Sequence, residues 1–283
     1  MPELPEVETT VRGLKREILG LKILSVWTDL KTEDKRKNDT VSNPKYFAFF
    51  KKEVTGKKIL SAERRAKNIL INLSGNKTIL IHLKMTGYLF YGKNPKIKYA
   101  HVIFPLSNKK YLAFSDLRKF GKITLLDTDL AHDSKHLKDF GPEPLAKNFN
   151  LGKFKERLDK KPNGKIKTIL LDQTILAGIG NIYSDEILWY AGIHPERKVS
   201  KIKEVEFKKM YQAMKKVLNE SIRLGGDSIS DYLNLYGQPG KFQTKHKAYG
   251  RTGEKCQKPG CKGVIMRKMI NGRSAHFCSV HQI

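Results

Sequence analysis

The stretch Ile69-Leu-Ile-Asn-Leu-Ser-Gly-Asn-Lys-Thr-Ile-Leu-Ile-His-Leu83 reads as two short strands joined by a turn. Aliphatic residues dominate 69–73 and 78–83, and Ser-Gly-Asn-Lys at 74–77 is typical of a turn. Two further short runs, 101–104 and 111–114, flank a segment that contains Pro105 and Ser-Asn-Lys-Lys. Short strands with such connections predict an antiparallel sandwich or barrel between roughly residues 20 and 127.

Helical patterns lie on both sides of these strands. Val7, Val11, Leu14 and Ile18 recur at helical spacing after Pro2. Near the other end a long amphipathic helix is expected before Gly225-Gly226; its apolar face is Phe207, Met210, Tyr211, Met214, Val217 and Leu218. Lysines at 208, 209, 215 and 216 lie on its other face, and a solvated face is favoured over a DNA contact for them.

These patterns predict a mixed α/β multidomain protein. Gly141-Pro-Glu-Pro144 interrupts both periodicities and marks a linker. We expect an N-terminal β-sandwich domain with flanking helices at 1–140, a linker at 141–152, a helical domain at 153–245 and a metal-binding hairpin at 246–283. The 283 residues are enough for such an arrangement.

Charge narrows the class of partner. Lys and Arg total 55 against 28 Asp and Glu, a formal net charge of +27. Such a field attracts polyanions and favours nucleic acid, although a ribosomal protein, a membrane-surface protein or a generally lysine-rich proteome would also be basic. The sequence has no apolar run long enough to cross a bilayer, and the acidic start Met-Pro-Glu-Leu-Pro-Glu is unlike a secretory signal. We therefore expect a cytoplasmic protein.

The cysteines indicate a metal site. All three lie in the pattern Cys256-x4-Cys261-x16-Cys278-x2-His281. Three thiolates and an imidazole complete a closed tetrahedral zinc site, so we expect one structural zinc ion. Between the ligand pairs, Asn271-Gly272 separates two β-like runs, which predicts a hairpin with Arg273 at its tip. The alternative is three incidental cysteines and a chance histidine.

The N-terminus is a candidate reactive site. If Met1 is removed, Pro2 presents a secondary amine, which can attack a sugar C1′ and form a cationic iminium. Glu3 and Glu6 follow and could transfer protons. Taken alone, this segment is more simply a helix start, with proline in the first turn and acids that complement the helix dipole.

Ordered motifs along the whole chain resemble the formamidopyrimidine-DNA glycosylases, bacterial enzymes that repair 8-oxoguanine. The first is Met1-Pro-Glu-Leu-Pro-Glu-Val-Glu8. The others are Arg64–Lys67, Ile81–Gly87, Asp116–Gly121, Gly141–Pro144, Gly178–Glu186 with Ala191–Pro195, Tyr249–Gly253 and Asn271–Ser274. The resemblance implies a helix–two-turns–helix in the helical domain and a zinc finger at the C-terminus.

The resemblance also implies an enzyme of base excision repair, a DNA-formamidopyrimidine glycosylase with abasic-site lyase activity. Pro2 would be the nucleophile and Glu3 the acid that opens the sugar ring. Lys67 would bind phosphate beside the lesion and assist β-elimination, and Arg273 would grip phosphates and assist δ-elimination.

Several other residues are carried over as contacts to double-stranded DNA. Met85, Arg118 and Phe120 would fill the gap left by the extruded base, for which an adaptable thioether, a donor and an aromatic wedge are suited. The remaining expected contacts are His82, Tyr99, Lys167, Asn181 and Tyr249. We expect a monomer that acts on DNA of the nucleoid.

Two features depart from the family pattern. The family's finger has two Cys-x2-Cys pairs, whereas this chain has a longer first knuckle and His281 in the fourth position, which puts Cys256 in doubt. Tyr99 stands where relatives often carry a histidine.

Substrate choice is inferred from two segments. The opening Met-Pro-Glu-Leu-Pro and the segment 226–242, which resembles the loop that covers a flipped 8-oxoguanine, favour oxidised purines. An endonuclease VIII-like enzyme for oxidised pyrimidines and a non-catalytic damage-binding protein remain the alternatives.

Overall fold

The computed structural model describes residues 1–95 and 97–283. Contacts divide the chain into two compact units, one formed by Met1–Lys138 with Leu224–Lys241 and the other by Asp139–Arg223 with Phe242–Ile283. The segment 224–241, which the sequence groups with the helical domain, thus packs with the first unit. The finer domain boundaries stay predictions.

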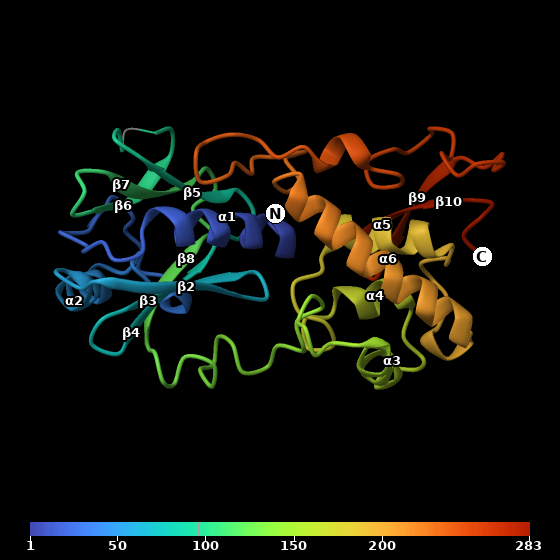
Figure 1. Cartoon of the computed structure of the whole chain (residues 1–283), viewed down its shortest axis with the longest axis horizontal. Coiled ribbons are helices and arrows are strands. Elements are labelled where there is room, and N and C mark those ends of the chain that lie inside the picture. Colours follow the sequence, from blue (N-terminus) through green and yellow to red (C-terminus); the bar gives the residue numbers. More distant parts are fainter. Residues whose placement is uncertain (96) are drawn as a thin grey trace. The chain divides into compact units, whose positions relative to one another are not determined.

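The first unit contains the expected antiparallel sheets (Figure 1). One sheet has the order β2-β3-β4-β8 and the other β1-β6-β7-β5. The strands are β1 (Trp27–Thr28), β2 (Ile59–Arg65), β3 (Asn68–Leu73), β4 (Lys77–His82), β5 (Gly87–Gly92), β6 (Ala100–Pro105), β7 (Tyr111–Asp116) and β8 (Lys122–Asp127). The stretch 69–83 is the β3–β4 hairpin, in register from Asn68↔His82 to Leu73↔Lys77.

One apolar core joins both sheets to the first helix. Ile71 and Ile79 of one sheet meet Phe104 and Leu112 of the other around a small apolar cavity. The helix α1 (Leu4–Glu17) contributes its predicted stripe, whose four residues are all buried. Because this stripe lies in the core, the helix that begins beside Pro2 is fixed by packing. The helix α2 (Pro44–Val54) and the short 3-10 turn η1 (Lys35–Lys37) complete the elements described in this unit.

The second unit is helical with a terminal hairpin. Its helices are α3 (Leu151–Asp159), α4 (Ile166–Leu171), α5 (Asn181–Ala191) and α6 (Glu204–Arg223), with the 3-10 turns η2 (Val199–Lys201) and η3 (Phe242–Lys245). The central helix α5 packs against α4, α6 and the last strand. The hairpin consists of β9 (Ile265–Ile270) and β10 (Arg273–Cys278), joined by the predicted Asn271-Gly272 turn.

The two-unit architecture confirms the predicted fold class. On α6 the predicted apolar face is buried apart from the half-buried Tyr211, while Lys208, Lys209 and Lys216 are exposed. Throughout residues 1–95 and 97–283, each helix is too short or too polar to span a membrane.

Candidate active site and nucleic-acid interface

The first turn of α1 buries the predicted catalytic pair. Pro2 and Glu3 are both buried, and Glu3 is the N-cap of the helix. The buried Glu6 carboxylate accepts the Glu3 amide at 2.8 Å and, through its other oxygen, the Asp227 amide at 2.8 Å. A carboxylate that accepts two backbone amides is held in one orientation, so this segment is rigid at the point where the nucleophile is predicted.

Lys67 lies in a tight turn of the same unit. The β2–β3 hairpin turns at Ala66-Lys67, and Ala66 has a φ of 53°, a left-handed conformation that costs energy in a residue other than glycine. Arg64 supports the turn by donating to the Ala66 carbonyl at 3.0 Å, and its Nε donates to Glu8 on α1, also at 3.0 Å. The turn that carries Lys67 is therefore tied to the helix that begins beside Pro2.

His82, at the end of β4, is held as a neutral imidazole. Burial, together with neighbouring lysines, lowers the pKa of His82 to about 3. Its Nδ1 accepts the Lys84 amide at 3.0 Å, so Nε2 carries the proton. A neutral imidazole with a fixed Nε2–H is a suitable donor to a phosphate oxygen.

The three predicted gap-filling residues lie together on the surface. Met85 and Phe120 are large exposed apolar residues, 41% and 46% accessible. Arg118 links them, because its Nη1 lies 3.3 Å from the Met85 sulfur and its guanidinium lies 4.6 Å from the Phe120 ring centroid. The fully buried Asp116 holds this loop by accepting the Gly121 amide at 2.7 Å.

Tyr99 lies on the same unit as an exposed residue. Its φ is 60°, and Lys98 lies over its ring at 5.0 Å from the centroid. Tyr99 therefore presents an exposed aromatic ring next to a lysine.

The segment 224–241, which contains all but the last residue of the predicted base-covering loop at 226–242, is anchored to α1. The buried Tyr232 donates its hydroxyl to the Glu6 carbonyl at 3.0 Å, and burial raises its pKa. The base of the loop needs glycine, because a Cβ on Gly240 would lie 2.2 Å from the Gly226 carbonyl oxygen. The exposed tip is residues 229–231.

In the second unit, Lys167, a predicted DNA contact, takes part in a buried ion pair. Its side chain is fully buried, and its ammonium contacts the Asp185 carboxylate at 2.6 Å. It also donates to the Asn181 carbonyl at 3.1 Å. Asn181 is the first residue of α5 and is partly exposed, so in this arrangement Asn181 reaches solvent and Lys167 does not.

Tyr249 lies in a loop that is pinned by Glu186. This fully buried carboxylate accepts the backbone amides of residues 247, 248 and 249, each at 2.9 Å. Burial raises the pKa of Glu186 against the effect of these amides and of His246. The Tyr249 ring packs on His276 of β10 at a centroid distance of 5.0 Å.

Arg273 is presented at the tip of the hairpin as predicted. Asn271 and Gly272 form the turn with φ values of 46° and 75°, and Arg273 is the exposed first residue of β10. This places a guanidinium at a hairpin turn, a suitable position for a phosphate contact.

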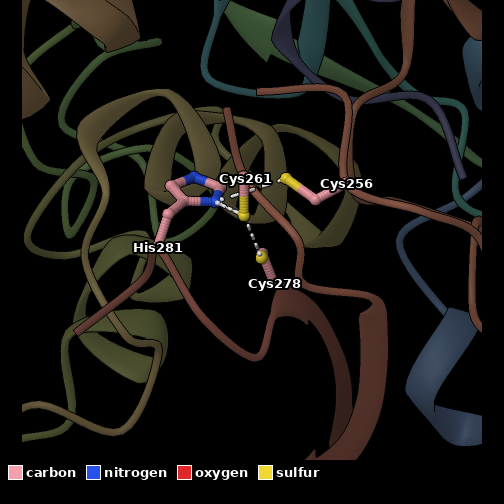
Figure 2. Close-up of side chains that lie close together, drawn as sticks. All are labelled: Cys256, Cys261, Cys278 and His281. Carbon is pink, nitrogen blue, oxygen red and sulfur yellow. Dashed lines mark hydrogen bonds between the residues drawn. The ribbon is translucent and has the colours of Figure 1, made fainter. Parts of the chain in front are cut away.

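The four predicted metal ligands converge (Figure 2). Ligand atoms of Cys256, Cys261, Cys278 and His281 all lie within 4.8 Å of one another, so Cys256 belongs to the cluster despite the longer knuckle. His281 turns its Nδ1 toward Cys256 Sγ at 3.3 Å, while its Nε2 donates to the Trp189 carbonyl at 3.0 Å. The unprotonated nitrogen therefore faces the thiols.

The surroundings of the sulfurs also fit a metal. Each cysteine sulfur accepts a backbone amide, from Lys258, Gly263 or Val280, at 3.4 to 3.5 Å. Such bonds stabilise thiolates. The donor set is therefore compatible with a closed four-ligand metal site.

Comparison with known proteins identifies the family. Residues 1–123 match the formamidopyrimidine-DNA glycosylase N-terminal domain, and residues 140–232 match the H2TH domain of the same enzymes. The chain belongs to the formamidopyrimidine-DNA glycosylase family. It is 40% identical over its whole length to the enzyme of Pelotomaculum thermopropionicum, covering 99% of that protein, and 38% identical to that of Streptococcus pneumoniae strain R6, with 98% of this chain and 97% of the relative covered.

Solved structures of the family agree with this assignment. The complex between Lactococcus lactis Fpg and DNA containing an abasic site matches with a TM-score of 0.87, 36% identity and 99% coverage of both chains. A complex of the same protein with DNA containing N7-benzyl-Fapy-dG matches equally well. The resemblance noted in the sequence is thereby confirmed.

Some positioning residues of this glycosylase-family chain were missed in the sequence. Asp116, Asp185, Glu186 and Tyr232 are buried polar residues that hold predicted contact loops. A signal existed for two of them, because Asp185-Glu186 interrupts the apolar run of α5, and a buried carboxylate needs fixed partners. Asp116 and Tyr232 carry no comparable pattern.

Proposed function

We propose that this chain is a bifunctional DNA glycosylase and abasic-site lyase of base excision repair, specific for oxidised purines. The observation that carries the proposal is the rigid first turn of α1. Glu6 holds the amide of Glu3 there, next to Pro2, and the turn that carries Lys67 is tied to the same helix. Membership of the family supplies the substrate class, damaged duplex DNA.

The proposed reaction begins after removal of Met1. The Pro2 amine forms a bond to C1′ of the damaged nucleotide while the bond from C1′ to the base breaks. The base leaves with the electron pair and takes up the proton that the Pro2 nitrogen loses. Glu3 then protonates the ring oxygen as the sugar opens, which leaves a cationic iminium between the proline nitrogen and C1′.

Two eliminations follow from the iminium. Because it withdraws electrons, the C2′ proton becomes acidic, and its loss expels the 3′ phosphate. Loss of a second proton, from C4′, then expels the 5′ phosphate. Lys67 assists the first elimination and Arg273 the second, as cations that stabilise the leaving phosphates.

The DNA contacts divide between the two units. In the first, His82 donates Nε2–H to phosphate, Met85, Arg118 and Phe120 fill the space of the extruded base, and Tyr99 contacts the backbone. In the second unit, the backbone contacts are Asn181, Tyr249 and Arg273. Unstacking a base costs a few kcal/mol, which inserted side chains offset.

The cluster of Cys256, Cys261, Cys278 and His281 would hold one zinc ion. Four protein ligands leave no open position, so the ion supplies structure to the finger and takes no part in bond making. We further propose that the protein acts as a monomer in the cytoplasm, on nucleoid DNA.

Borohydride trapping tests the proposal. Reduction in the presence of duplex DNA containing 8-oxoguanine should yield a covalent complex, and mass spectrometry of its peptides should place the adduct on Pro2. Absence of any complex with a confirmed proline N-terminus would refute the enzyme proposal. Faster excision of thymine glycol than of 8-oxoguanine would favour the pyrimidine-specific alternative.

A further inference from the structure

The hairpin of the second unit is attached to the region of α4 by three polar contacts. Glu196 bridges Lys268 on β9 and Lys165, at 2.5 and 2.8 Å. At the turn, the Asn271 side chain donates to the Thr168 hydroxyl at 3.2 Å. The third contact joins His276 on β10 to Lys167 through Asp185, and it differs from the other two in its burial.

Burial makes this third contact the dominant one. The side chains of Lys167 and Asp185 are 0% and 1% exposed, whereas those of Lys165 and Lys268 are 40% and 56% exposed. Exposed ion pairs are screened by water and salt and contribute little, whereas a buried pair is strongly coupled. Among these three polar contacts, the one through Asp185 therefore couples the hairpin most strongly to α4.

Both oxygens of Asp185 are used. Oδ1 accepts from Lys167 Nζ at 2.6 Å, and Oδ2 accepts both the backbone amide and Nδ1 of His276 at 3.0 Å. Because a carboxylate only accepts, Nδ1 of His276 carries the proton in this contact. The carboxylate thus joins a strand of the hairpin to α4.

Lys167 also connects the Asp185 carboxylate to the start of α5. Lys167, Asp185 and His276, with the contacts between them, are called the network below. An ammonium has three donors, and that of Lys167 contacts the Asn181 carbonyl at 3.1 Å, the Ser184 hydroxyl at 2.8 Å and Asp185. One buried cation thus connects the helix turn that carries Asn181 to the strand that begins with Arg273.

We propose that Lys167 and Asp185 are positioning residues that make Asn181 and Arg273 engage the DNA backbone as one unit. The inference rests on the proposed function, which assigns phosphate contacts to those two residues. Lys167 acts through Asp185 and His276, and its ammonium stays off the DNA. Without the network, the turn would keep the exposed contacts of Asn271 and Lys268, and the hairpin would keep the packing of β10 on α5 and the metal cluster, whose residues flank its other end.

A double-mutant cycle tests this inference without requiring catalysis. The variants are Lys167→Met, Asp185→Leu and the combination of both, in the zinc-loaded full-length protein. The probe is a duplex containing a tetrahydrofuran abasic analogue, with Kd measured at one salt concentration. We expect each single variant to bind about tenfold more weakly and the double variant no more weakly than the weaker single variant, since all three remove one network.

Additive losses in this cycle would overturn the inference, because they would mean that Lys167 contacts DNA independently of Asp185. The double variant replaces the ion pair with apolar side chains, so it avoids an unpaired buried charge if a single variant fails to fold. Metal content and Tm are measured for each variant.

A second readout follows the chemistry that Arg273 is proposed to assist. His276→Leu should shift the products on abasic DNA from β,δ-elimination toward β-elimination alone, while trapping at Pro2 continues. The matched control Glu196→Gln removes an exposed bridge of the same hairpin and should stay within about twofold of wild type. A wild-type product ratio in His276→Leu would overturn the inference, whereas absence of trapping in the wild-type protein would refute the proposed function instead.

Discussion

Pro2 and Arg273, the two predicted reactive residues farthest apart in sequence, are held by different physical means. Pro2 precedes a helix whose apolar stripe is buried in the core of the first unit. Arg273 lies at the exposed turn of a two-stranded hairpin, and β9 buries only its terminal residues, Ile265 and Ile270. A hairpin this small is marginal in water, so it depends on the metal cluster and on α5.

This difference implies a division of tasks. The nucleophile requires a fixed geometry, because misplacement of a reacting atom by about 1 Å can cost on the order of 10²-fold in rate. A phosphate contact tolerates more movement and benefits from exposure. Burial of the apolar stripe of α1 fixes the geometry around Pro2. A hairpin held by a metal cluster exposes Arg273 and needs few residues to do so.

The largest effect is expected from Glu3→Gln. Glutamine keeps the size and the N-cap position but cannot transfer a proton, so ring opening and formation of the iminium should slow by about 10²- to 10⁴-fold. Tm should remain near wild type, because the core stripe of α1 is unchanged. Single-turnover borohydride trapping on 8-oxoguanine DNA measures the effect, and a loss of less than tenfold would remove Glu3 from the proton-transfer role.

Metal removal should destabilise the hairpin that carries Arg273 and leave the core of the first unit intact. After chelation, amides of β9 and β10 should lose protection from hydrogen exchange, while those of β3 and β4 keep it. DNA affinity should fall at least tenfold, since the hairpin presents Arg273. Readdition of zinc should restore both. Protected hairpin amides in protein shown to be metal-free would mean that α5 alone maintains the finger.

Much of the structure around Pro2 and Arg273 could be predicted from the sequence. Local patterns predicted the β3–β4 hairpin, the stripe of α1 and the Asn271-Gly272 turn, because each depends on neighbouring residues alone. The ligand spacing predicted the cluster, including His281. The predicted gap-filling residues also lie together, although that assignment rested on resemblance.

Other features depend on contacts distant in sequence. The resemblance predicts that Lys167 contacts DNA, and the structure places its side chain in a buried pair with Asp185. No local pattern in the sequence predicts that burial. Glu6 meets Asp227 across more than 200 residues, and the segment 224–241 returns to the first unit for the same reason. Such pairings depend on the tertiary fold, which local periodicity does not specify.

His82 should give the first unit a specific acid sensitivity. Its pKa is lowered to about 3 in the folded state, whereas an unfolded histidine titrates near 6.5. Below pH of about 6.5, His82 binds a proton in the unfolded chain but not in the folded protein. The contribution of neutral His82 to the free energy of unfolding is therefore present above that pH and is lost as pH falls toward 3. His82→Gln should therefore show a smaller decrease in Tm between pH 7 and 4.5.

Nuclear magnetic resonance gives the direct check on this prediction. The His82 ring should keep the Nε2–H tautomer from pH 7 to 5, as reported by its ¹⁵N shifts. A midpoint near 6.5 would contradict the account of the site, because it would mean that neither burial nor the neighbouring lysines act on the ring.

The smallest effect is expected from Tyr232→Phe, which tests how the segment 224–241 is anchored to α1. Loss of the buried hydroxyl that donates to the Glu6 carbonyl should cost about 1 kcal/mol and lower Tm by about 2–4 °C. Tyr236→Phe is the matched control in the same segment, because its hydroxyl donates to Glu17 at the surface and its loss should cost less than about 0.5 kcal/mol. Equal effects in thermal denaturation would show that burial does not distinguish the two anchors. A larger effect at Tyr232, with slower 8-oxoguanine excision, would show that this hydrogen bond holds the loop next to Glu6 in the arrangement that the reaction uses.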